Sequence, residues 1–232
     1  MLTKFKLVLV ISSVALLSAC GGGSGGTVAP SGPVASVNAF NIKAGYTALV
    51  VGGFTTTLTI SGSCSGTFTL TTGRANTAAT FEAVTGFSGV SVGGFSFTNC
   101  TPASVFSTTT NYYDSNYMPL GSSSTDLYGK YLTPPIIPTA AHVGDVGLVG
   151  TKTYYTNSTK TTGDGREDTS YVMEADTATT AIINLISKAY NQAGTLLVTE
   201  QDRYRVAADG TLTLFAIDFQ FANGSRTHLV GN

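Results

Sequence analysis

Alternating polar and apolar residues, broken at short intervals by glycine-containing turns, constrain the fold of this chain more than any other feature. In FTTTLTI, residues 54–60, the phenylalanine, leucine and isoleucine share one face and the threonines share the other. Successive side chains of a β-strand point to opposite faces, so a two-residue period predicts a half-buried strand. The many β-branched threonines also favour extended structure. The sequence therefore predicts a mainly β protein.

The C-terminal segment 144–232 shows the same period in several consecutive stretches. Asp-Gly at 209–210 and Asn-Gly at 223–224 are typical of tight hairpin turns. We therefore predict an antiparallel β-meander, in which Phe215 and Phe219 point to the same covered face.

Residues 177–190 fit two interpretations. Their apolar spacing matches a helix, with Asp176 as a cap and Gly194 beyond its end. Their threonines and isoleucines, and the turn that follows them, favour a strand. We predict the strand.

Glu200 and Asp202 pose a question of register. They share strand parity with apolar or aromatic neighbours such as Val198 and Tyr204, while Arg203 points to the other face. Either the strand extends beyond the covered part of the sheet, or a bulge changes its register. A role of this segment in binding is the functional alternative to modest surface charge pairs.

The chain also divides by composition. We predict an N-terminal β domain over 37–125, a connection over 126–143, and the meander over 144–232. The connection is rich in tyrosine and proline, and prolines lack the N–H that a regular ladder needs. The expected fold is two β subdomains built as antiparallel sandwich or meander sheets.

The first nineteen residues have the layout of a secretory signal peptide. Lys4 and Lys6 precede an apolar run over 7–17, and Ser18 and Ala19 are small. The run is shorter than the roughly 20 residues that a membrane-spanning helix needs. Residues 1–19 are therefore predicted to be cleaved.

The sequence Leu17-Ser18-Ala19-Cys20 resembles the lipobox of bacterial lipoproteins at every position. The resemblance implies cleavage before Cys20 and acylation of that residue. It also implies attachment in the cell envelope, and Gly21 in place of Asp points to the outer membrane. Residues 20–36 are rich in glycine and serine and predict a flexible tether that follows the lipidated cysteine.

With Cys20 lipidated, Cys64 and Cys100 remain as an even number in an oxidising compartment, which predicts a disulfide between them. It would close a loop of about 37 residues and contribute roughly 3–4 kcal/mol. The GSCSG stretch around Cys64 imitates a nucleophile elbow. A strand is expected after it, however, where that motif needs a helix.

Few residues carry charge, and no site chemistry stands out. Charged residues make up 11% of the chain, and without Lys4 and Lys6 its net charge falls from −1 to −3. The absence of a basic run argues against a nucleic-acid partner. The only histidines, His142 and His228, are far apart in sequence, so neither a metal site nor a cofactor is expected.

These features predict a non-catalytic, lipid-anchored envelope protein with a structural or interaction role. Tyr112, Tyr113 and Tyr117 form the candidate surface for a protein or glycan partner, because tyrosine suits recognition. The alternative is a periplasmic carrier that holds a lipid or another apolar ligand in the C-terminal meander.

The lipobox gives a direct prediction. Cys20→Ala should move the protein from the membrane fraction to the soluble fraction, because each lost acyl methylene removes roughly 0.8 kcal/mol of membrane binding. Ultracentrifugation and immunoblotting would measure the distribution, with Ser24→Ala as the control. A Cys20→Ala chain that stays in the membrane pellet would contradict the assignment.

Overall fold

The structure is a computed structural model that describes residues 32–62 and 64–231. The signal peptide, Cys20 and most of the tether lie outside the described residues. The described part contains the helix α1 (Ile42–Gly52) and thirteen strands: β1 (Phe54–Gly62), β2 (Gly66–Thr72), β3 (Thr77–Phe81), β4 (Val84–Phe97), β5 (Ser104–Asp114), β6 (Pro119–Ser123), β7 (Tyr128–Tyr131), β8 (Val146–Tyr155), β9 (Gly163–Ala175), β10 (Ala181–Asn191), β11 (Leu196–Val206), β12 (Leu212–Phe221) and β13 (Arg226–Gly231). Among these residues, no helix combines the length and apolar character that a membrane crossing requires.

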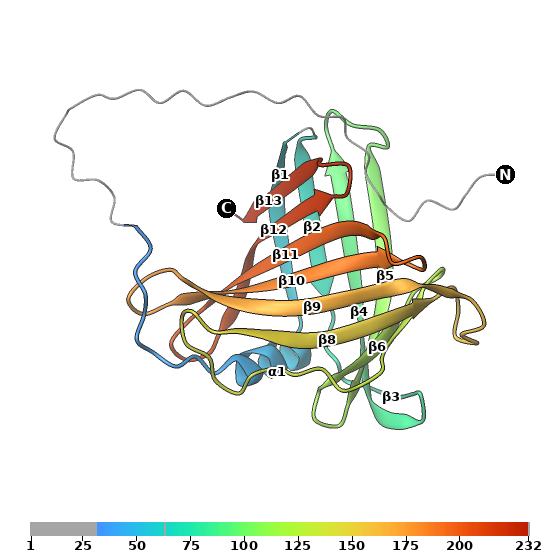
Figure 1. The fold of residues 1–232 in the computed structure, drawn as a ribbon, viewed down its shortest axis with the longest axis horizontal. Helices are drawn as coiled ribbons and strands as arrows, with labels where there is room; N and C mark the ends of the chain where they lie inside the picture. The colour runs from blue at the N-terminus through green and yellow to red at the C-terminus, as the bar shows by residue number, and fades with distance from the viewer. Residues whose placement is uncertain (1–31, 63, 232) are drawn as a thin grey trace.

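The strands form one antiparallel sheet that closes on itself (Figure 1). Neighbours follow the order β2-β1-β13-β12-β11-β10-β9-β8-β7-β6-β5-β4-β3, and an additional β2–β4 pairing completes the ring. The mainly β, antiparallel prediction is confirmed, but the predicted sandwich is wrong. The fold is a closed barrel of twelve strands, because β2 and β3 share one edge of β4.

That shared edge contains a break that binds α1. β2 pairs with residues 91–97 of β4 and β3 pairs with residues 84–88, so residues 73–76 interrupt what would otherwise be a single strand. The amide of Ala75 donates to the carbonyl of Val50 at 2.9 Å, and Arg74 Nε donates to the carbonyl of Gly52 at 3.2 Å. Residues 73–76 thus supply hydrogen-bond donors to two of the carbonyl groups at the C-terminal end of the helix.

The helix covers one end of the barrel (Figure 1). Asn41 caps it by accepting a hydrogen bond from the amide of Ala44 at 3.2 Å. Gly45 lies so close to the turn before β12 that a Cβ atom would clash with the carbonyl oxygen of Gly210. The segment shows no convincing helical period, and its glycine and β-branched residues have low helix propensity. Packing into the barrel end stabilises the helix instead.

Both predicted β subdomains contribute strands to the same sheet. β1 pairs with β13, and β7 pairs with β8, so segments 37–125 and 144–232 contribute to one sheet instead of two separate ones. The connection 126–143 supplies β7, and its three prolines follow that strand outside any ladder. Within the segment predicted as a tether, 20–36, Val34 forms an isolated bridge with Asp176.

Two expectations for the meander have different outcomes. Residues 181–191 form β10, which confirms the strand over the helix. The prediction that Phe215 and Phe219 point to the same covered face of β12 is wrong. A register shift leaves Phe215 as an extra residue between the pairs Arg203–Ala216 and Tyr204–Leu214. The bulge places the Phe215 ring 5.1 Å from the guanidinium of Arg205, which is exposed.

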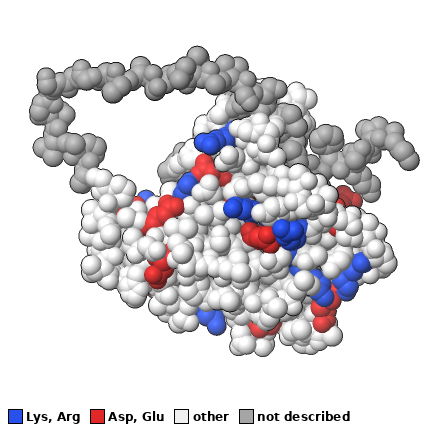
Figure 2. All heavy atoms as spheres, viewed as in Figure 1, with Lys and Arg blue, Asp and Glu red and all other residues white. Residues whose placement is uncertain are grey.

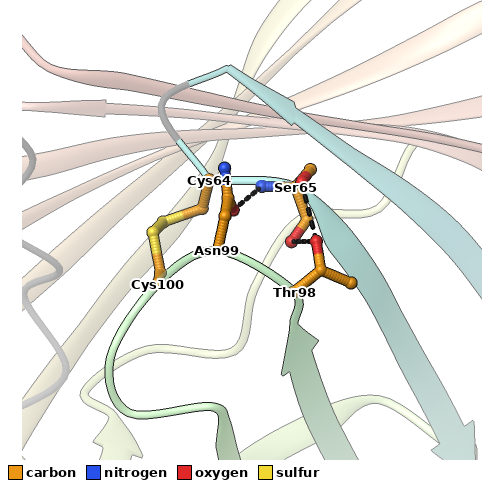
Figure 3. Close-up of a disulfide and its surroundings, with 5 residues drawn as sticks. All are labelled: Cys64, Ser65, Thr98, Asn99 and Cys100. Atoms are coloured by element: carbon orange, nitrogen blue, oxygen red, sulfur yellow. Dashed lines mark hydrogen bonds between the residues drawn. A yellow bond between two sulfur atoms is a disulfide. The ribbon is translucent and has the colours of Figure 1, made fainter.

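The disulfide between Cys64 and Cys100 is present, as predicted (Figure 3). The two Cα atoms lie 5.7 Å apart. Beside it, Asn99 Oδ1 accepts a hydrogen bond from the amide of Ser65 at 2.7 Å. Cys64 belongs to an apolar cluster that includes Leu58, Ile60, Phe68, Phe97 and Leu229 and fills the part of the barrel behind the disulfide.

The contact between Gly45 and Gly210 predicts a strong size limit at this position. Gly45→Val should lower the free energy of unfolding by about 1–3 kcal/mol, because the added side chain must displace a backbone carbonyl. Ala48→Val, at an exposed position of the same helix, is the control and should change it by about 0.5 kcal/mol. Equal effects in urea denaturation would show that α1 does not pack tightly in the barrel end.

Candidate functional site

The barrel contains a partly open cavity of about 500 Å³. The side chains of Ile42, Tyr46, Leu49 and Val50 from α1 line it on one side. The rest of its wall comes from strands all around the barrel, and Phe54 and Leu70, which line it, also pack against the apolar cluster near the disulfide. The cavity therefore lies between the helix and the apolar cluster.

β11 carries its charges on both faces of the sheet. Asp202 and Tyr204 line the cavity, and Glu200 lies on the same face by strand alternation. Arg203 and Arg205 point outward, where they pair with Asp218 and Asp176. The sequence left open whether the two carboxyl groups lie beyond the covered part of the strand, and the structure places them inside.

The outer surface carries few charges, and they occur together. On the face shown in Figure 2, acidic and basic side chains lie in neighbouring groups within a mostly uncharged surface. Asp176 Oδ2 accepts from Arg205 Nε at 2.8 Å, which holds the pKa of that carboxyl below its usual value. Asp218 contacts both Arg203 and His228. These outer carboxylates thus have cationic or histidine partners.

Inside the barrel, Lys152 of β8 and Glu167 of β9 form an ion pair. Lys152 Nζ lies 3.6 Å from Glu167 Oε1, and Tyr154 donates its hydroxyl proton to Glu167 Oε2 at 3.0 Å. Burial lowers the pKa of Lys152, but the charge of Glu167 and the neighbouring tyrosines raise it well above its usual value. The lysine is therefore held in its charged form.

Glu200 and Asp202 form a second, different pair, because both are acids. Each has an apolar cross-strand neighbour in β12, Phe219 opposite Glu200 and Ile217 opposite Asp202. Burial raises the pKa of both carboxyl groups, that of Asp202 to about 7, and the charge of Asp202 raises the pKa of Glu200 further. A hydrogen bond between them opposes the shift at Asp202. The pair therefore shares a proton near neutral pH.

One oxygen of this pair has no partner. Oδ1 of Asp202 is buried and accepts no hydrogen bond from any described residue. A buried polar atom without a partner costs about 1–3 kcal/mol, and more when it carries charge. Asp202 lines the cavity, but its Oδ1 atom is covered by the protein, so the burial of this oxygen is left uncompensated.

Tyrosine rings surround the same space. Tyr46, Tyr113, Tyr131 and Tyr204 line the cavity from α1, β5, β7 and β11. Burial raises the pKa of all four, that of Tyr113 to about 12, so their hydroxyls stay protonated. They offer neutral hydroxyl groups and electron-rich ring faces to the cavity.

The three tyrosines predicted to form a partner surface do not lie on one exposed surface. Tyr113 is 8% exposed and faces the barrel interior. Tyr112 stacks on Phe81 with ring centroids 4.5 Å apart, and Tyr117 stacks on Phe87 at 5.1 Å. The rings are largely used in packing within the barrel.

The sequence does not mark Lys152 and Glu167 as interior residues. Lys152 shares strand parity with Tyr154, and a register shift at 148–150 in β8 obscures which face is inward.

Within residues 32–62 and 64–231, no three His, Cys, Asp or Glu side chains are placed to hold a metal ion. His228 instead contacts Asp218 on the outer surface.

Comparison with known proteins gives no relative: no family model matches this chain, and no curated protein or solved structure matches it significantly.

The raised pKa values predict how stability depends on pH. The folded state binds the protons of Glu200 and Asp202 more tightly than the unfolded chain does. The contribution of Asp202 is complete below about pH 4 and is lost as the pH rises to about 7. Relative to the double variant Glu200→Gln, Asp202→Asn, the wild type should lose on the order of 2–4 kcal/mol over that range.

Urea denaturation at several pH values would measure this difference. Asp126→Asn, at an exposed turn position, makes the same chemical change outside the barrel and should follow the wild type. Parallel curves for the wild type and the double variant would show that the two carboxyl groups are not buried.

Proposed function

We propose that this protein is a binding protein that holds a small organic ligand inside its barrel and is attached to the bacterial envelope through a lipid on Cys20. The observation that carries the proposal is the cavity of about 500 Å³ inside the barrel. Ligand sites typically have volumes of about 300–1,000 Å³ and combine apolar walls with a few converging polar groups.

The lining of the cavity has this composition. Apolar side chains such as Leu49, Leu70 and Leu185 alternate with the charged and hydroxyl groups of Lys152, Asp202 and the tyrosines. A cavity that served only stability would cost free energy, because interiors are normally close-packed. Binding explains why the barrel leaves this space open.

This proposal develops the carrier alternative of the sequence analysis over the interaction role. The tyrosines on which the interaction role depended are packed against other rings or face inward. The lipobox and the following glycine-rich segment support a protein attached to the outer membrane. No catalytic step is proposed for the cavity.

A ligand carried in the cavity should survive gentle purification. Mass spectrometry of an organic extract of the natively purified chain is expected to detect a small molecule in stoichiometric amount. Ser187→Phe places a ring in the cavity and should reduce that amount at least about tenfold. Thr213→Phe, at an exposed position of β12, is the control and should retain it.

The proposal would fail if the wild type yielded no organic molecule. It would also fail if Ser187→Phe, shown to be folded by circular dichroism, retained as much as the wild type.

A further inference from the structure

The barrel interior holds one ammonium group, that of the Lys152 side chain. Lys152 Nζ lies 3.6 Å from a carboxylate oxygen of Glu167. It also lies 5.8 Å from the ring centroid of Tyr131 and 5.1 Å from that of Tyr154. A carboxylate supplies charge, and the faces of aromatic rings attract cations. Together these groups hold a buried cation in place of water.

A second set of the same groups lies in the same cavity without a cation. Asp202, with its partner Glu200, supplies the carboxylate, and Tyr46, Tyr113 and Tyr204 supply the rings. Among the described residues, the arginines of β11 face outward. Lys152, the cation on the cavity wall, pairs with Glu167.

The charge balance of the interior favours a cationic guest. Lys152 and Glu167 cancel, so the acid pair leaves the cavity with one negative charge once it has released one of its two protons and shares the other. An uncompensated charge in a low-dielectric interior is costly, and an anionic guest would add to that cost. A neutral guest could donate to the carboxyl group of Asp202, but it would leave the charge unbalanced.

We propose that the cavity binds an organic ammonium ion, with its nitrogen next to the carboxyl group of Asp202 and the ring of Tyr204. Leu49, Leu70 and Leu185 supply an apolar wall for the remainder of the molecule. The guest is therefore an amine with an apolar or aromatic body. This inference rests on the proposed binding function and identifies the class of ligand.

Binding of such a cation should depend on pH. The other titratable groups that face the acid pair are Glu167 of β9, Lys152 of β8 and Tyr204. The cross-strand neighbours in β10 and β12 are uncharged. A bound cation stabilises the deprotonated pair, so affinity should rise between about pH 5.5 and about pH 8, and binding should release a proton.

Three probes that share a phenylethyl group can test the charge requirement on the full chain by titration calorimetry. They are 2-phenylethylammonium, the neutral 2-phenylethanol and the anionic 3-phenylpropanoate. The ammonium should bind about 10–100-fold more tightly than the alcohol, as expected for a charge-assisted hydrogen bond with a cation–π contact. Its binding heat should vary with the ionisation enthalpy of the buffer.

Variants locate the site. Glu200→Gln combined with Asp202→Asn keeps the shape of both side chains and should remove the preference for the ammonium over the alcohol. Asp126→Asn, outside the barrel, should leave that preference unchanged. A double variant that kept the full preference would overturn the assignment to this pair.

The outcomes separate this inference from the binding function itself. If the alcohol or the carboxylate binds as tightly as the ammonium, the cavity is a binding site but the cationic ligand class is wrong. If none of the three binds, the inference fails as well. If, in addition, the natively purified chain carries no organic molecule, the binding function fails with it.

Discussion

The pairing of β2 with β4 is the interaction on which the rest of the structure depends. Without it the strands would form an open sheet with one wet face, as many antiparallel sheets do. With it, every second residue of each strand points into the barrel. The polar groups of these side chains then need hydrogen-bond partners inside the barrel. The break at residues 73–76 permits this closure and also receives the end of α1, which covers the barrel at that end.

Closure explains why the charges of the protein differ so sharply between its two faces. Outside, carboxylates such as Asp176 and Asp218 have arginine partners. Inside, Lys152 and Glu167 balance each other, whereas Glu200 and Asp202 are two acids side by side, and one oxygen of Asp202 has no hydrogen-bond partner among the described residues. A chain selected for stability alone would fill this space with apolar side chains. The retained space and charge are the physical basis of the proposed binding function.

The strand period, the glycine turns and the cysteine count predicted the β content, the strand over 181–191 and the disulfide correctly, because each depends on local pattern or on simple chemistry. Closure could not be predicted, because it depends on a contact between β2 and β4 whose register no local pattern encodes. The helix was missed because tertiary contacts at Gly45 and Ile42 stabilise residues of low propensity. The sequence shows that Glu200 and Asp202 lie on the same strand face as apolar residues. Only the closed barrel shows that this face points inward.

Hydrogen exchange of the backbone amides in β2 tests the closed barrel most directly. If β2 lies between β1 and β4, its amides on both edges are bonded and should exchange as slowly as those of β10, which lies in the middle of the meander. An open sheet would leave the amides that face β4 accessible to water. Fast exchange at those amides in the folded protein, with protection on the β1 side alone, would contradict closure and the cavity inside the barrel with it.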